Sequence, residues 1–189
     1  NVAHSDELAI GQVKPMHFFE KDFVIWRGED GKVRATDAYC LHLAAHLGYG
    51  GVVKGNDLEC PFHAWSYTGE GKIAAIPYAK SISPKVQNSC LYVWPVVELN
   101  RHIVVWYHPD RSVAPLWEPM KIDELEDSKW APFETFDWVI NTHIRDLAEN
   151  SCDFPHFLYV HRVGELPPPG EIVDDGWTRN TKATVQFVT

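Results

Sequence analysis

Residues 40–63 read CLHLAAHLGYGGVVKGNDLECPFH and carry two short cysteine-histidine motifs. Cys40 and His42 form a CxH motif, Cys60 and His63 form a CxxH motif, and 17 residues separate His42 from Cys60. We call these four residues the quartet. Thiolates and imidazoles at this spacing lie at the tips of two short loops, and they are ligands that both zinc and iron-sulfur centres use.

The order of the residues distinguishes between these two kinds of metal centre. Structural zinc fingers usually pair cysteine with cysteine and histidine with histidine, whereas here each motif contributes one of each. That order suits a [2Fe-2S] cluster in which one iron binds both cysteines and the other binds both histidines. Because Trp65 and Tyr67 follow the CPFH segment, the sequence resembles the two cluster-binding loops of the Rieske family. The resemblance implies that the quartet binds the cluster; a zinc site and four unrelated core residues are the alternatives.

The loops also indicate a branch of the Rieske family. Respiratory bc-type members have an additional cysteine in each loop and a serine that donates a hydrogen bond to the cluster, whereas the matching places here hold Ala45, Phe62 and Trp65. Fewer hydrogen bonds predict a reduction potential toward the lower end of the range of about −150 to +300 mV for Rieske centres. Ala64 stands where the family commonly has glycine, and His46 fits neither motif, so we interpret His46 as a non-ligand.

The N-terminal part of the chain predicts short β-strands. Residues 22–37 read as a β-hairpin with an apolar run, Phe23 to Trp26, before a turn rich in glycine and acidic residues. β-branched and aromatic residues predict further strands at 52–53, 58–59, 65–67, 91–94 and 103–107. These elements predict an all-β unit of about 110 residues.

Prolines and acidic residues then mark a change of composition, and we place a domain boundary near Leu116. Beyond it, apolar residues at helical spacing predict a helix through the 140s and 150s, capped at Asn141 or Thr142, with a bend or restart at Pro155. We expect an α+β fold. The remaining predicted elements are strands at 133–139 and 182–188 and a loop at 167–170.

Residues 149–161, ENSCDFPHFLYVH, hold a second group of candidate ligands. His156 and His161 lie in the predicted helical region, and two imidazoles are part of the ligand set of non-haem Fe(II) sites. Taken alone, this pair is better explained by two structural histidines. With the quartet upstream, the pattern resembles the mononuclear iron motif of the Rieske non-haem iron oxygenases, the ring-hydroxylating oxygenase alpha-subunit family.

This resemblance implies roles for four residues. His156 and His161 are expected to bind the mononuclear iron. Asp153 matches the acid that links the two metal centres, by hydrogen bonds to the first iron histidine and to a Rieske histidine, here His63, of a neighbouring subunit. Asn150 matches a polar residue close to the iron. The alternative for Asp153 and Asn150 is that both are solvated residues on the helix surface with no role at the metal.

The third iron ligand of the family is a carboxylate far downstream. The acidic residues that follow His161 come too early in the sequence: Glu165, Glu171, Asp174 and Asp175. We therefore expect residues 1–116 to form the Rieske domain and 117–189 the N-terminal part of an incomplete, helix-grip-like catalytic domain. The alternative is that the iron site of this protein naturally lacks the carboxylate ligand.

The activity that this resemblance implies is oxygenation. Rieske oxygenases use electrons from the cluster to activate O2 at the mononuclear Fe(2+), in monooxygenation, dihydroxylation or desaturation. NAD(P)H is expected to supply the electrons through a separate reductase, with a ferredoxin as a further candidate partner, because no GxGxxG fingerprint is present. The resemblance also implies a homotrimer. The competing function is a Rieske ferredoxin-type electron carrier, which needs nothing after about residue 115.

The amino-acid composition argues against two classes of interaction, with nucleic acid and with the membrane interior. Lys and Arg total 17 against 26 Asp and Glu, a net charge of −9, which argues against nucleic acid. No apolar run approaches the roughly 18 residues of a membrane span. We expect a cytoplasmic protein; the alternative is a protein whose N-terminal anchor has been removed. Cys90 and Cys152 have no histidine beside them, and we expect both to be ordinary buried thiols.

The substrate is the least constrained prediction. Residues 50–79, with Ile-Pro-Tyr after the second motif, look more like the branch of 3-ketosteroid 9α-hydroxylases and sterol desaturases than the naphthalene-type dioxygenases. A sterol or steroid is therefore the favoured substrate, with an aromatic or alicyclic acid as the second candidate.

Overall fold

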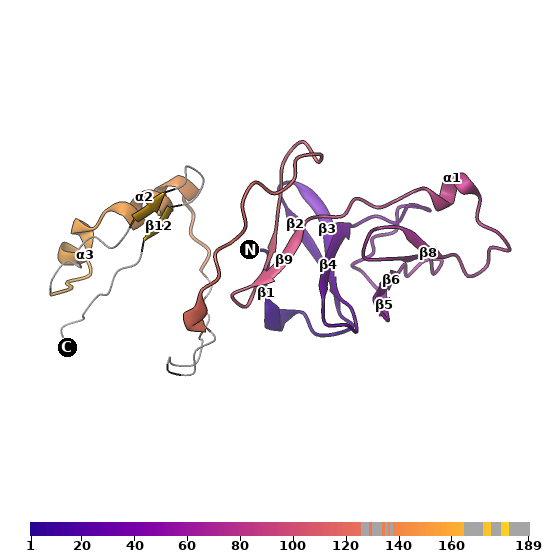
Figure 1. Cartoon of the computed structure of the whole chain (residues 1–189), viewed down its shortest axis with the longest axis horizontal. Coiled ribbons are helices and arrows are strands. Elements are labelled where there is room, and N and C mark those ends of the chain that lie inside the picture. The colour runs from indigo at the N-terminus through magenta and orange to yellow at the C-terminus, as the bar shows by residue number, and fades with distance from the viewer. Residues whose placement is uncertain are drawn as a thin grey trace. The chain divides into compact units, whose positions relative to one another are not determined.

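The structure is a computed structural model that describes residues 1–125, 129, 134, 136, 138–164, 172–174 and 179–181. Its contacts divide the chain into two compact units, Asn1–Trp130 and Ala131–Thr189. Figure 1 shows the first unit as small antiparallel sheets and the second as short helices with a strand pair. In the described part of the chain, no helix has the length and apolar character needed to cross a membrane.

Three antiparallel sheets build the first unit. The first sheet consists of β2 (Val13–Phe18), β3 (Lys21–Arg27) and β4 (Val33–Asp37). The second consists of β5 (Val52–Lys54), β6 (Asp57–Glu59), β7 (Ser66–Tyr67) and β8 (Ile73–Ala75). The third consists, in spatial order, of β1 (Ala3–His4), β10 (His102–Val105) and β9 (Val96–Leu99). The short helices of this unit are η1 (Ser5–Glu7), α1 (Pro84–Gln87) and η2 (Asp123–Leu125).

The central strand β3 separates two hydrophobic cores. Its side chains alternate between them, because successive residues of a strand point to opposite faces of a sheet. Val24 and Trp26 belong to the core that contains both quartet cysteines, while Phe23 and Ile25 belong to the core beneath β10. Burial on both faces explains why these four residues form a continuous apolar run, and the predicted hairpin is confirmed by the antiparallel β3–β4 pair.

The other strands predicted in the first unit are confirmed except for 91–94. This segment pairs through one isolated bridge, Thr36 with Val93, and a second bridge joins Lys72 to the preceding Cys90. Its backbone is nevertheless anchored, because the N–H of Trp94 donates to the Ala35 carbonyl at 3.0 Å. Pro95 follows directly and lacks the N–H that a continued ladder needs. The prediction of a strand was therefore wrong, although the segment packs against the sheet.

Residues beyond the predicted domain boundary remain attached to the first unit. The side chain of Asn100 donates to the carbonyl of Met120 and accepts the N–H of Ile122, both at 2.8 Å. The contacts therefore divide the chain after Trp130 rather than near Leu116. The division into functional domains at 116 and 117 stays a prediction.

The second unit contains α2 (Ile144–Cys152), α3 (Pro155–Tyr159) and the strand pair β11 (Ile172–Asp174) and β12 (Arg179–Thr181). The predicted helix is present and restarts at Pro155, which occupies the first turn of α3, where its missing N–H costs nothing. Of the strand expected at 133–139, the described residues 134, 136, 138 and 139 lie outside any strand. The expected strand 182–188 and loop 167–170 fall outside the described residues.

The N-terminal cap of α2 differs from the prediction. His143 is the cap, and its ring Nδ1 accepts the N–H of Arg145 at 3.1 Å. The hydroxyl of Thr142 instead donates to the Asp146 carboxylate at 2.7 Å. The expected cap at Asn141 or Thr142 was therefore wrong, because an imidazole one residue later satisfies the free helix N–H.

The cysteines outside the quartet are both exposed, which corrects their prediction as buried thiols. Cys90 lies at an isolated bridge, and its thiol donates to the carbonyls of Glu70 at 3.1 Å and Leu91 at 3.2 Å. Cys152 is the last residue of α2. Neither position is packed in a hydrophobic core of the described residues, so both thiols meet solvent.

Candidate metal centre

The two quartet loops close in the same way. Each cysteine donates its N–H to the carbonyl five residues later, at 2.9 Å from Cys40 and 2.8 Å from Cys60. Each cysteine carbonyl also accepts the N–H of the alanine four residues later, at 2.9 Å from Ala44 and 3.1 Å from Ala64. Both alanines have positive φ, 54° and 55°. The loops are therefore a matched pair, although one places its histidine two residues after the cysteine and the other three.

The left-handed backbone at Ala64 explains why glycine suits this position. An L-residue in this conformation carries a steric cost of roughly 1–2 kcal/mol that glycine avoids.

We expect Ala64→Gly to stabilise the protein by about 0.5–1 kcal/mol, since relief of that strain exceeds the added freedom of glycine in the unfolded chain. Urea unfolding of the metal-free protein measures the change. Ala75→Gly, in the ordinary extended backbone of β8, is the control and should lower stability. Equal destabilisation by both substitutions would contradict the strain at Ala64.

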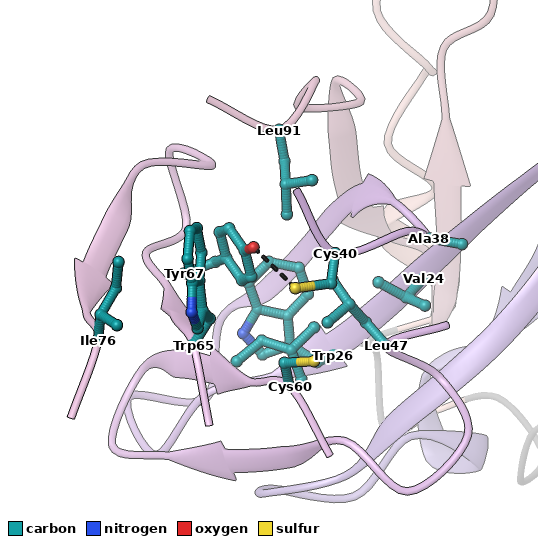
Figure 2. Packing of buried hydrophobic residues seen from close by; sticks show 11 residues of the cluster. Val24, Trp26, Ala38, Cys40, Leu47, Cys60, Trp65, Tyr67, Ile76 and Leu91 are labelled. Atoms are coloured by element: carbon teal, nitrogen blue, oxygen red, sulfur yellow. Dashed lines mark hydrogen bonds between the residues drawn. The ribbon is translucent and has the colours of Figure 1, made fainter. Parts of the chain in front are cut away.

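The quartet sulfurs lie together inside the core. Cys40 and Cys60 are free thiols, each 3% exposed, in the cluster that contains Trp26 (Figure 2). Burial raises the pKa of the Cys60 thiol, and hydrogen bonds from the backbone of Phe62 and His63 oppose this effect. The neighbouring Cys40 thiol also raises the pKa of Cys60. A metal that binds both sulfurs displaces their protons, and its positive charge stabilises the two thiolates in the buried site.

The quartet imidazoles also lie together. The ring centroids of His42 and His63 are 4.7 Å apart, with 72° between the ring planes. Two imidazoles that bind one metal through nitrogens at about 2.1 Å have centroids about 4.5–5.5 Å apart. Nδ1 of His42 is buried and has no hydrogen-bond partner, which suits a ligand atom. The residues therefore fit a [2Fe-2S] cluster with one two-cysteine iron and one two-histidine iron.

Tyr67 is a contributor that the sequence analysis did not identify. Its hydroxyl lies 3.0 Å from Cys40 Sγ, shown by the dashed line in Figure 2, and its oxygen accepts the N–H of Leu41 at 3.0 Å. Burial, reinforced by the Cys40 thiol, raises the pKa of Tyr67, so its hydroxyl stays protonated. It therefore donates to the sulfur when Cys40 is a thiolate. The only sequence signal is the place of Tyr67 seven residues after Cys60.

We expect Tyr67→Phe to lower the reduction potential of the cluster by about 40 mV, the equivalent of a hydrogen bond of about 1 kcal/mol. The donor stabilises the more negative reduced state, so its removal favours the oxidised state. Redox titration of the visible spectrum measures the shift. Tyr49→Phe is the control, because Tyr49 is exposed and stacks on His46. An unchanged potential in Tyr67→Phe would contradict this role.

His46 lies away from the quartet contacts. Its Nδ1 accepts the N–H of Gly48 at 3.1 Å, and its ring packs against Tyr39 and Tyr49. These contacts support the interpretation of His46 as a non-ligand.

The second unit brings the other candidate ligands together. His156 in α3 and His161 just beyond it have ring centroids 5.2 Å apart, within the range for two imidazoles on one metal. Asp153, the C-terminal cap of α2, has a carboxylate oxygen 3.8 Å from Nδ1 of His156. Asn150 lies one turn earlier, is exposed, and accepts the N–H of Asp153 through its carbonyl at 3.3 Å.

The backbone sets the tautomer of His156. Its Nδ1 forms a hydrogen bond with the carbonyl oxygen of Asp153. A carbonyl only accepts, so Nδ1 carries the proton and Nε2 keeps its lone pair. This arrangement prepares Nε2 as a metal ligand.

Among the described residues, no third ligand accompanies His156 and His161. No group of three or more His, Cys, Asp or Glu side chains in the described part of the chain is placed around one metal ion, and the quartet is argued above as two pairs, one for each iron of a cluster. Of the later acidic residues, Asp174 lies in β11, and the others fall outside the described residues: Glu165, Glu171 and Asp175.

An all-β unit with two matched cysteine-histidine loops defines the class of [2Fe-2S] electron-transfer domains. Residues 1–95 match the family described as Rieske [2Fe-2S] domain, and the chain belongs to this family. Residues 105–174 match the 3-ketosteroid 9alpha-hydroxylase C-terminal domain. The expected family and the α+β fold are confirmed.

Several proteins whose names state an activity are similar to this chain. The chain is 38% identical over 157 residues to cholesterol 7-desaturase nvd 1 of Ciona intestinalis, covering 83% of this chain and 33% of that protein. It is 37% identical to a probable 3-ketosteroid-9-alpha-monooxygenase oxygenase component of Rhodococcus rhodochrous, covering 82% and 38%. The crystal structure of apo dicamba monooxygenase matches with a TM-score of 0.55 and 25% identity, over 63% of this chain and 36% of that one. The chain thus spans about a third of the length of the curated relatives it matches.

Proposed function

We propose that this chain is part of an oxygenase component that combines a Rieske cluster with a mononuclear non-haem iron and oxidises a sterol or steroid. The observation that carries this proposal is the pair His156 and His161, 5.2 Å apart, in a chain whose N-terminal unit is a Rieske domain. The competing electron carrier needs no second pair of histidines.

Each group of residues has a distinct task in this function. When bound, the Rieske cluster supplies single electrons and the mononuclear iron supplies open positions for O2. The quartet holds the cluster, and Tyr67 donates a hydrogen bond to one of its sulfur ligands. His156 presents Nε2 and holds its Nδ1 proton on a backbone carbonyl. The remaining ligand of the iron is expected to be a carboxylate, which the described residues do not supply.

The names of the relatives support the choice of substrate. They include cholesterol 7-desaturases from several animals and a 3-ketosteroid monooxygenase component. Both activities modify a steroid ring, one by removing hydrogen and the other by adding oxygen. An aromatic or alicyclic acid is the second candidate; the likeness to dicamba monooxygenase at 24% identity supports only the shared fold.

The proposal includes partners for electron transfer. A separate reductase that uses NAD(P)H, with or without a ferredoxin, would reduce the cluster. We place Asp153 between His156 and His63 of a neighbouring subunit in a head-to-tail trimer, a heterologous interface that closes. The Asp153 carboxylate lies 3.8 Å from Nδ1 of His156, which supports its place beside this histidine, although the Nδ1 proton itself is held by the Asp153 backbone carbonyl. A cytoplasmic location is also part of the proposal, supported by the free thiols.

The test supplies the full-length protein with a reductase and NADH, and offers cholesterol, a 3-ketosteroid and benzoate in separate reactions. Mass spectrometry is expected to detect a desaturated or hydroxylated steroid that depends on O2 and reductase. Conversion of benzoate alone would favour the second candidate substrate. Rapid reduction of the cluster with no oxidation of any substrate would favour the electron carrier.

A further inference from the structure

The side chain of Trp65 crosses from the second quartet loop to the first. Its indole is stacked on the ring of His42, with centroids 4.8 Å apart and only 3° between the planes. Trp65 is 8% exposed and packs in the core cluster, where Figure 2 shows it beside Tyr67. A buried indole therefore packs in parallel against one face of the His42 imidazole.

Tyr78 fixes the outer edge of this indole. Trp65 Nε1 donates a hydrogen bond of 2.7 Å to the Tyr78 hydroxyl oxygen. Tyr78 is 59% exposed and lies in a turn in which the N–H of Ala79 donates to the carbonyl of the buried residue Ile76 at 3.0 Å. The indole N–H can only donate, so this oxygen satisfies it and sets the orientation of the ring.

The same tyrosine also meets the other histidine ligand. The rings of Tyr78 and His63 lie edge to face, with centroids 6.5 Å apart and 70° between the planes. His63 in turn packs against His42 at 4.7 Å. One hydrogen-bonded pair, Trp65 and Tyr78, thus contacts one imidazole by its face and the other by its edge.

On the basis of the [2Fe-2S] site proposed above, we infer that Trp65 and Tyr78 are positioning residues that together hold both imidazoles of the cluster. Partners that orient metal ligands control how firmly the metal is held. Without the Tyr78 hydroxyl, the indole loses its acceptor and can tilt, and His42 tilts with it. The two residues therefore act as a unit, so removing either end of their hydrogen bond has the same consequence.

The experiment compares Tyr78→Phe, Trp65→Phe and the double variant in full-length protein carrying a reconstituted [2Fe-2S] cluster. Pulsed EPR of the reduced cluster measures the nitrogen couplings of the two histidines, and loss of visible absorbance measures the rate of cluster release. Tyr78→Phe is expected to change the nitrogen coupling of His42 and to accelerate release about fivefold. The double variant should release the cluster no faster than Trp65→Phe, because the pair shares one interaction.

Tyr49→Phe is the matched control, since Tyr49 is an exposed tyrosine that stacks on the non-ligand His46. Thermal unfolding of the metal-free variants separates positioning from general stability, and Tyr78→Phe should melt within a degree or two of the parent. Nitrogen couplings and release rates in Tyr78→Phe that match Tyr49→Phe would overturn the inference, even if Trp65→Phe fails to fold. Additive effects in the double variant would also overturn it. Failure of the parent protein to bind any cluster would instead reject the Rieske site itself.

Discussion

We expect His156→Ala to abolish substrate oxidation while the Rieske spectrum stays unchanged. His156 belongs to the second compact unit, whereas the quartet belongs to the first. Loss of one imidazole removes an iron ligand, so turnover should fall by at least roughly a thousandfold. Product analysis by mass spectrometry and the visible spectrum of the oxidised protein measure the two properties on the same sample.

His143→Asn is the matched control for this substitution. His143 lies in the same unit and caps α2, a task that asparagine also performs well. The control should retain activity, mononuclear iron and cluster. Normal turnover in His156→Ala would contradict its role as an iron ligand, and loss of the cluster signal would mean that this histidine supports folding instead.

The second large effect is expected from Cys40→Ser, which should remove the visible chromophore completely. Cys40 is buried beside Cys60, and a serine hydroxyl there is a poor ligand for iron that also leaves a polar group in the core. Absorbance and the content of acid-labile sulfide in the purified protein measure the loss.

Cys90→Ser serves as the control, because Cys90 is exposed and its thiol only donates to backbone carbonyls. It should retain the full chromophore. A Cys40→Ser protein that keeps its colour and sulfide, or a Cys90→Ser protein that loses them, would contradict the assignment of the quartet.

The sequence predicts the fold well where one pattern dominates. The run Phe23 to Trp26 is buried on both faces of a central strand, so its strong apolar character identifies β3. Strand β2 is not predicted, because Pro15 interrupts it. The structure accommodates Pro15 because β2 is an edge strand of its sheet, where one side of the backbone needs no ladder hydrogen bond.

Long-range contacts explain what the sequence does not predict about the site. The spacing of the quartet predicts the candidate ligands of the cluster, because they form local motifs in two loops. The contact of Tyr67 with Cys40 spans 27 residues, and that of Trp65 with His42 joins different loops. Such pairs depend on how the sheets pack, so only the structure reveals them. The exposure of Cys90 is likewise set by a tertiary bridge rather than by its neighbours in sequence.

The most direct test of the central claim is the ligand set of the cluster in the unmodified protein. The measurement combines iron and acid-labile sulfide analysis with pulsed EPR of the reduced protein labelled with 15N-histidine. We expect about two sulfides per chain and couplings from two histidine nitrogens bound to the cluster. Bound zinc without sulfide, or a cluster with no coupled histidine nitrogen, would contradict it.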